Sequence, residues 1–336
     1  MRTMPHCQLL IPDLFWREGW DASRDLALPA LRALTARGQM QSTAGASPEA
    51  WLCDAWGVAR QNDWPVAPLT LQLDGGQAGP YYWLRADPVH LHLQRDHVML
   101  ADSGTFAISQ QEAVRYTEAL NLHFCHDGLI FYPLHPARWY LRLEAVPGLR
   151  TAELGSAAGR DIRALLLDGV DALRWRGIFN EIQMLLHHHP DNEAREARGE
   201  PAINSVWLWG GGSLPHVAAH YASVLAGDAL PLALALAAGS AHAALPPSAG
   251  MVAMQAGNNL IVLDQLRGAA QYGDLQGYRD QLAALERNWF APLKAMLGKG
   301  ALARLDIVAL GTENAQSFTV RRNDLWKFWR RKQARQ

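Results

Sequence analysis

Hydrophobic runs of two kinds alternate along this chain, and they predict alternating strands and helices. Short continuous apolar runs predict buried strands at 7–11, 260–263 and 305–310. Leucines at helical spacing predict helices at 21–37 and 274–297. Because strands that alternate with helices form parallel sheets, the pattern predicts an α/β fold: a mainly parallel sheet with helices on both faces.

The middle of the chain has a different pattern, rich in short strands, which predicts an inserted smaller α+β lobe. Ser109 and Glu112 form a capping-box pattern at the start of a predicted helix. A Gly- and Pro-rich turn cluster at 74–80 follows a predicted short strand at 69–73 and marks a lobe boundary. The predicted domains are therefore an α/β domain formed by 1–75 and 206–336, and an inserted lobe with a helical connection at 76–205.

Three further elements follow from local signals in 161–220. A helix is predicted over 161–188, stopped by Pro190 and followed by a polar loop up to Pro201. A strand at 206–209 is predicted to end at the three glycines that follow it. Leu214 and Pro215 are then expected to lead into a helix that carries His216 and His220 one turn apart.

Composition excludes several classes of partner and compartment. The chain of 336 residues is 49% hydrophobic and 19% charged, with a formal net charge of −1, which is typical of a globular protein with no global attraction to nucleic acid or anionic membranes. Its three cysteines, Cys7, Cys53 and Cys125, lack CxxC spacing, and no secretory signal or membrane span is indicated. We expect a cytoplasmic protein.

The basic, aromatic C-terminal segment is the one local exception. It is predicted to be a final helix whose Trp326 and Trp329 pack on the body while its cations face water. A nucleic-acid-binding tail is the alternative, in which case deleting the residues after Asn323 should abolish a salt-sensitive binding.

The segment HPDNEAREARGEPAINSVWLWGGG at 189–212 is the most distinctive in the chain. It resembles a block found in archaeal-type cofactor-independent phosphoglycerate mutases. Two shorter stretches, WLRAD at 83–87 and GLIFYP at 128–133, are similar to further parts of that family. The resemblance covers roughly residues 75 to 290. It implies the alkaline phosphatase superfamily fold, with a second lobe inserted into the phosphatase sheet.

The same segment supplies candidate ligand-binding residues. Arginine side chains can clamp a phosphate or carboxylate, an amide can orient a substrate hydroxyl, and glycine backbone amides can approach an anion closely. The candidates are Arg195, Arg198, Asn204, Gly210, Gly211 and Gly212. The alternative is that the glycines form only a tight turn and the arginines a solvated loop.

The residues that would hold metals are largely missing. The resemblance implies two divalent metals held by Asp and His at strand ends, activating a Ser or Thr nucleophile. Asp13 and Asp264 match two of the expected acids, but Gly268 stands where the motif that begins at Asp264 requires His. No histidine occurs after His242. We therefore expect no metal and no cofactor, with Asp13 and Asp264 as the remaining candidate ligands.

Two functions remain from these observations. One is a phosphoglycerate-mutase-like regulatory or phosphometabolite-binding pseudoenzyme, with a phosphorylated small molecule as its partner. The alternative is an active metal-dependent mutase or phosphohydrolase that uses Mn or Zn at a rearranged site. The alternative requires Asp13, Asp264 and at least two histidines to meet within about 5 Å.

Overall fold

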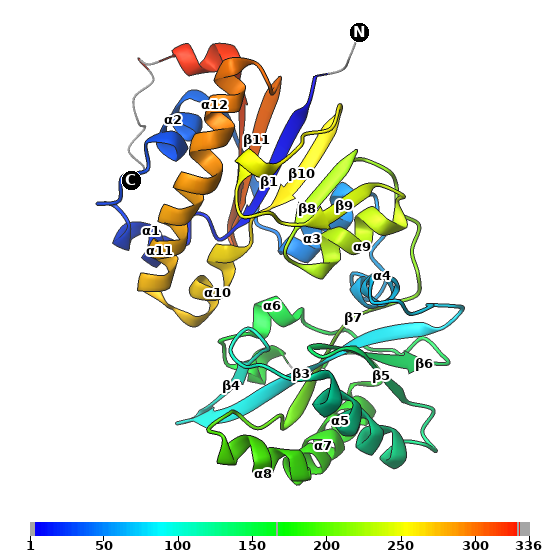
Figure 1. Cartoon of the computed structure of the whole chain (residues 1–336). Coiled ribbons are helices and arrows are strands. Elements are labelled where there is room, and N and C mark those ends of the chain that lie inside the picture. Colours follow the sequence, from blue (N-terminus) through cyan, green and yellow to red (C-terminus); the bar gives the residue numbers. More distant parts are fainter. Residues whose placement is uncertain (1–3, 166, 328, 330–336) are drawn as a thin grey trace. The chain divides into compact units, whose positions relative to one another are not determined.

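The structure, a computed structural model, describes residues 4–165, 167–327 and 329 (Figure 1). It divides into two compact units. The first runs up to Trp56 and resumes at Val217, and the second is Gly57–His216. Each unit has its own sheet and its own core.

The first unit contains a seven-stranded sheet with the order β2-β12-β11-β1-β10-β8-β9. Strands β11, β1, β10, β8 and β9 are mutually parallel, whereas β12 is antiparallel to both of its neighbours. The strands are β1 (His6–Pro12), β2 (Gln39–Ala44), β8 (Ser223–Ala226), β9 (Ala241–Ala244), β10 (Asn258–Val262), β11 (Arg304–Leu310) and β12 (Asn314–Arg321).

Helices cover both faces of this sheet, as the sequence pattern predicts (Figure 1). One face packs on Cys7, Leu9 and Ile11, and its core includes residues of α2, α11 and α12. On the opposite side α3 and α9 contact each other. The helices of the unit are α1 (Arg17–Ala22), α2 (Pro29–Arg37), α3 (Pro48–Ala55), α9 (Ala229–Ala237), η2 (Ala249–Met251), α10 (Gln265–Tyr272), α11 (Leu275–Leu285), the π-helical turn η3 (Glu286–Phe290), α12 (Ala291–Lys299) and η4 (Arg322–Trp326).

The second unit contains an antiparallel five-stranded sheet in which β3 pairs with β4, β6 and β7. Alternate residues of β3 point to opposite faces: Tyr82 and Leu84 pack with α5 and α7, whereas Trp83 packs with α4. The elements are α4 (Val66–Leu73), β3 (Tyr82–Gln94), β4 (His97–Ala101), α5 (Gln110–His123), β5 (Ile130–His135), β6 (Arg138–Leu143), α6 (Leu154–Ala157), η1 (Ile162–Leu165), α7 (Ala172–His187), α8 (Pro190–Ala197) and β7 (Ser205–Gly212).

The strand predicted at 69–73 is a helix, α4. Its residues are apolar on nearly every side and are buried against β3 and β7, and a short apolar run of this kind fits a buried helix as well as a strand. Since α4 and β7 both pack within the second unit, this unit spans Gly57–His216, where the sequence suggests 76–205.

Several predicted boundaries are wrong for local reasons. The helix expected at 21–37 is two helices, because Pro29 disfavours helical geometry at Leu28 and instead starts α2. The loop expected after Pro190 is α8, since proline is well tolerated at the first position of a helix. Residues 161–171 precede α7, and the segment that holds His216 and His220 is not helical.

The capping box predicted at Ser109 and Glu112 is confirmed. The hydroxyl of Ser109 accepts a hydrogen bond from the Glu112 amide at 3.2 Å, and the Glu112 carboxylate accepts one from the Ser109 amide at 2.9 Å. Ser47 likewise caps α3 through the Ala50 amide at 3.1 Å. At the C-terminus the expected packing is wrong: the side chains of Trp326 and Trp329 are 72% and 67% exposed. Residues 330–336 lie outside the described part of the chain.

Candidate functional site

The carboxyl ends of the parallel strands β1 and β10 bring the two predicted acids to one edge of the sheet. Asp13 follows β1 directly, and Asp264 comes two residues after β10. The strands are adjacent, and the Leu263 amide donates to the Leu10 carbonyl at 2.9 Å. Ligand sites of open α/β sheets form at such an edge. Asp13 and Asp264 therefore follow adjacent strands of the sheet.

The backbone of Asp13 adopts an uncommon conformation at this edge, with φ of 58°. A non-glycine residue rarely populates the left-handed region, so surrounding contacts must hold it. Its amide donates to the Leu310 carbonyl at 2.9 Å, and its carbonyl accepts from the Tyr278 hydroxyl at 3.2 Å. The turn after β1 is thus fixed by β11 and α11.

A cation of the chain itself lies among the carboxylates here. Arg267, on the first turn of α10, forms an ion pair with Glu49 at 2.7 Å, and the two side chains are 19% and 6% exposed. Burial disfavours the charged guanidinium, but the carboxylates of Glu49, Asp228 and Asp13 outweigh burial and raise the pKa of Arg267. The edge therefore carries a largely buried, permanently charged guanidinium.

Asp264 responds to the same environment. Burial is the largest cause that raises the pKa of its carboxyl, the charge of Asp228 adds to it, and Arg267 acts in the opposite direction. Nearby, Oε2 of Glu49 and Oε1 of Gln265 are buried without a hydrogen-bond partner among the described residues. Unpaired buried oxygens are uncommon in folded proteins.

The residues at this edge do not fit the two-metal centre that the fold family implies. Within residues 4–165, 167–327 and 329, no three His, Cys, Asp or Glu side chains are grouped so that they could hold a metal ion. The loop after β11, residues 311–313, supplies Gly, Thr and Glu but no imidazole. Arginine cannot act as a ligand because its guanidinium stays protonated.

Sequence reasoning missed Arg267, although a signal was present. It lies three residues after Asp264 and directly before Gly268, so it shares the first turn of α10 with the acid. Glu49 lies in the first turn of α3, and nothing local connects it to Arg267, 218 positions away. Only the tertiary fold joins them.

The segment at 189–212 folds into α8 and β7 of the second unit. Arg195 is completely buried. Its guanidinium donates to Glu112 at 3.0 Å, to the Pro201 carbonyl at 2.8 Å and to the Ala107 carbonyl at 2.9 Å. These contacts tie α8 to the start of α5, and they engage the nitrogens that an anion would need.

Arg198 is half-exposed and pairs with Glu200 at 2.8 Å and with Glu112 at 3.2 Å. Burial alone would raise the pKa of Glu112, but the hydrogen bonds from Ser109 and Arg195 outweigh it and lower this pKa to about 2. Both candidate arginines therefore already have a carboxylate partner. Anion binding by Arg198 stays a prediction.

The strand predicted at 206–209 does not end at the three glycines, because Gly210, Gly211 and Gly212 are buried residues of β7. The tight turn, the alternative to anion binding, is therefore not formed. A Cβ added at Gly212 would lie 2.5 Å from Cβ of Pro65, and one added at Gly211 would lie 2.6 Å from the Tyr82 hydroxyl. Side chains of the unit itself occupy the space beside these glycines. They permit close packing of α4 and β3 on β7.

The side chain of Asn204 bonds to β3 and shares none of its hydrogen-bond partners with Arg195 or Arg198. Its Oδ1 accepts from the Leu91 amide at 2.8 Å and its Nδ2 donates to the Leu91 carbonyl at 2.7 Å. Asn204 also lines a cavity between α7 and the strand β3. The structure thus separates Asn204 from the other members of the predicted set.

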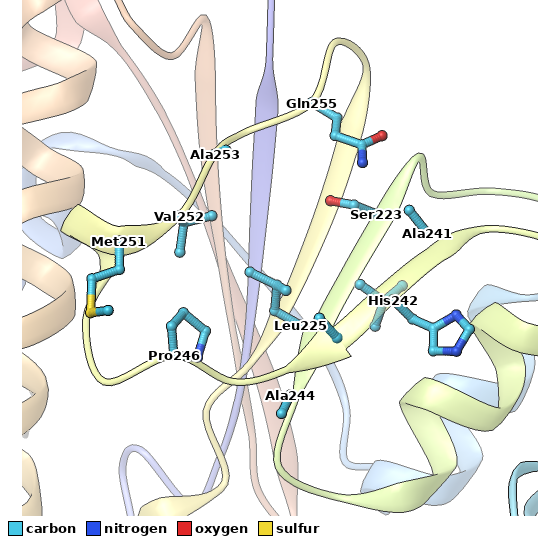
Figure 2. A pocket seen from close by; sticks show the side chains of 12 residues that line it. Ser223, Leu225, Ala241, His242, Ala244, Pro246, Met251, Val252, Ala253 and Gln255 are labelled. Carbon is cyan, nitrogen blue, oxygen red and sulfur yellow. The ribbon is translucent and has the colours of Figure 1, made fainter.

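A smaller hollow of about 280 Å³ lies along β8 and β9 in the first unit (Figure 2). Leu225, Pro246, Met251 and Val252 surround it, and His242 is directed away from Met251. Among the described residues that line it, His242 is the only ionisable one. A single exposed imidazole supplies no convergent chemistry, so this hollow is not a candidate active site.

Comparisons with known proteins agree with the family resemblance over part of the chain. A probable 2,3-bisphosphoglycerate-independent phosphoglycerate mutase of Geobacter sulfurreducens is 26% identical over 161 residues, which are 47% of this chain and 39% of that protein. A 2,3-bisphosphoglycerate-independent phosphoglycerate mutase of Methanosarcina barkeri is 28% identical over 122 residues, 36% of this chain and 31% of the relative. No family model matches the chain.

The chain thus spans less than two fifths of the length of the curated relatives it matches. Among solved structures, the PH0037 protein from Pyrococcus horikoshii has the same fold with a TM-score of 0.53 and 12% identity, covering 96% of this chain and 90% of that one. None of the helices within the described residues has both the length and the apolar character needed to span a bilayer. The chain is therefore similar, over part of its length, to cofactor-independent phosphoglycerate mutases, and it has the mixed α/β fold of the Pyrococcus horikoshii protein.

Proposed function

We propose that this phosphoglycerate-mutase-like protein has a degenerate metal centre and acts as a regulatory or phosphometabolite-binding protein rather than as a mutase. The supporting observation is Arg267, whose guanidinium supplies positive charge to the carboxylates at the carboxyl edge of the sheet. A buried carboxylate group needs compensating cations, and here one of them is covalently part of the chain.

The magnitude of this effect is large enough to matter. At an effective dielectric constant of 20, two unit charges 4 Å apart interact by about 4 kcal/mol, so a divalent cation at that distance from the guanidinium would be repelled by about 8 kcal/mol. Glu49 would also be unavailable as a ligand for a catalytic dication, because its carboxylate is bound to Arg267 at 2.7 Å. Charge repulsion and a missing ligand therefore act in the same direction.

The alternative, an active mutase with a rearranged site, requires histidines beside Asp13 and Asp264. In the part of the chain that the structure describes, no such group of metal-binding side chains exists. The sequence also contains no histidine after His242, in the segment where this superfamily places late ligands. The observations favour the non-catalytic function.

Metal analysis together with a mutase assay tests the proposal. The purified full chain should contain substoichiometric metal and should not interconvert 2- and 3-phosphoglycerate, with or without added Mn²⁺. Near-stoichiometric bound metal combined with turnover would overturn the proposal and establish the alternative.

Substitution of Arg267 gives a sharper test of the reason behind it. Arg267→Ala removes the guanidinium from Glu49 and the neighbouring carboxylates, so Mn²⁺ should raise the thermal midpoint of this variant while leaving the wild-type midpoint unchanged. Arg267→Lys is the matched control, because it keeps the positive charge and should stay insensitive to Mn²⁺. Equal Mn²⁺ responses of all three proteins would contradict the charge argument.

A further inference from the structure

A second and larger cavity, of about 580 Å³, lies within the second unit, beside α7. A volume of this size accommodates a small organic molecule. The residues that line it come from β3, β4, the η1 segment, α7 and the residue before β7: Leu91, Val98, Ile162, Arg163, Arg176, Phe179, Asn180, Gln183, Met184, His187, His188 and Asn204.

The charge of this lining is one-sided. Neither Asp nor Glu is among the described residues of the lining, whereas two arginines and two histidines are. Three amide side chains add hydrogen-bonding capacity, and these are Asn180, Gln183 and Asn204. A concave surface whose charged groups are all cationic attracts an anion.

The two arginines differ in how much of their positive charge neighbouring groups compensate. Arg163 is bound to Asp161 through Nε at 2.9 Å and Nη2 at 2.7 Å, so its charge is largely neutralised. Arg176 donates to the Leu167 carbonyl at 3.0 Å. Asp168, whose pKa Arg176 helps to lower, is itself bound to Arg150 at 2.7 Å. Arg176 therefore retains most of its charge for a ligand.

Two imidazoles continue the polar lining along α7. His188 contacts the Met184 carbonyl through Nδ1 at 2.9 Å, and the rings of His187 and His188 meet edge to face with centroids 5.0 Å apart. Nε2 of His188 is not used by that carbonyl contact. The last turns of α7 thus present imidazole nitrogens beside the cavity.

The remaining lining is apolar. Leu91 and Val98 come from paired strands, and Phe179 and Met184 come from α7. Met184 is 64% exposed, so this part of the wall is open to solvent. The cavity therefore combines an apolar wall with a cationic rim.

We propose that this cavity binds an amphipathic organic anion, with its carboxylate or phosphate group at Arg176 and its aliphatic or aromatic body on the apolar wall. The arginines of the 189–212 segment are already paired with carboxylates, whereas Arg176 is bound to a carbonyl. The cavity is also independent of Arg267, so failure of the metal test would not affect it.

Two dyes that differ by one charged group provide the test. 1-Anilinonaphthalene-8-sulfonate carries an aromatic body and an anion, and N-phenyl-1-naphthylamine is the same body without the sulfonate. We expect the anionic dye to bind the wild-type full chain at one site at least tenfold more tightly than the neutral dye. Equal affinities would overturn the proposal.

Charge variants localise the site. Gln183→Glu introduces a carboxylate into the lining and should weaken the anionic dye at least tenfold, and Arg176→Gln should weaken it at least threefold. Neither should weaken the neutral dye. Arg174→Gln is the matched control, because Arg174 is on α7 but does not line the cavity. An Arg174→Gln loss as large as that of Arg176→Gln would show general surface binding and refute the site.

Displacement of the anionic dye then identifies the class of ligand. Octanoate and octyl phosphate should both displace it from the wild-type chain, and the more effective one identifies the preferred head group. Octanol has the same chain without a charge and should not displace it at equal concentration. Displacement by octanol as effective as that by both anions would mean that only the apolar wall binds.

Discussion

The buried Arg195 gives the most direct test of whether the 189–212 segment binds an anion or holds the second unit together. Arg195→Met keeps an apolar chain of similar length and removes the guanidinium. The variant leaves the carbonyls of Ala107 and Pro201 and the carboxylate of Glu112 without this donor. Removing one partner of a buried ion pair typically costs about 3–5 kcal/mol.

The structure favours the lower end of that range, about 3 kcal/mol at pH 7. Glu112 keeps the Ser109 amide at 2.9 Å and Arg198 at 3.2 Å, so its charge is not left wholly unpaired. Arg198→Met is the matched control. Since Arg198 is 49% exposed, its loss should cost less than about 1 kcal/mol.

The pH dependence supplies a second signature. The pKa of Glu112 is held at about 2, below its ordinary value of 4.5. A carboxyl with a lowered pKa stabilises the fold above its unfolded pKa, and this stabilisation is lost as the pH falls through the folded value. In the wild-type chain the difference corresponds to about 3 kcal/mol, lost between pH 4.5 and 2. Without Arg195 the pKa of Glu112 rises, so the cost of Arg195→Met should shrink as the pH falls.

Native-state hydrogen exchange of peptides from α5 and α8 is the appropriate assay, because two compact units need not unfold together. The opening free energy of these helices should fall by about 3 kcal/mol in Arg195→Met at pH 7 and by less at pH 3. A loss below about 1 kcal/mol at pH 7, or an equal loss at both pH values, would refute the structural role. Retained stability with a loss of stabilisation by inorganic phosphate would support the anion-binding hypothesis instead.

Two further predictions concern packing and thiol chemistry. Gly212→Ala should destabilise the second unit by about 2 kcal/mol in urea unfolding, because its Cβ would lie 2.5 Å from that of Pro65. Gly177→Ala, with open space around it in α7, should instead stabilise the unit by about 0.5 kcal/mol. Equal effects of the two substitutions on the unfolding free energy would contradict the packing around Gly212. With a thiol-reactive disulfide reagent under native conditions, the exposed Cys125 should react rapidly. Cys7 should react only on unfolding, because burial raises the pKa of the Cys7 thiol. Rapid reaction of Cys7 in the folded chain would be inconsistent with its position in β1.

The sequence by itself determined the features that depend on neighbouring residues. Buried strands at β1, β10 and β11 follow from continuous apolar runs, and the caps at Ser47 and Ser109 follow from side chains that bond amides three positions away. Such interactions are complete within one stretch of chain. For the same reason the position of Asp264 at the end of a strand follows from the apolar run that precedes it.

The tertiary structure decided the features that depend on distant partners. α4 is a helix because apolar residues of β3 and β7 surround it, and β7 belongs to the antiparallel sheet because it pairs with β3. The site depends on distance even more strongly: Glu49 reaches Arg267 across 218 positions. Charge compensation in a buried site is set by three-dimensional proximity, so sequence revealed the missing histidine, and only the fold revealed the arginine beside the carboxylates.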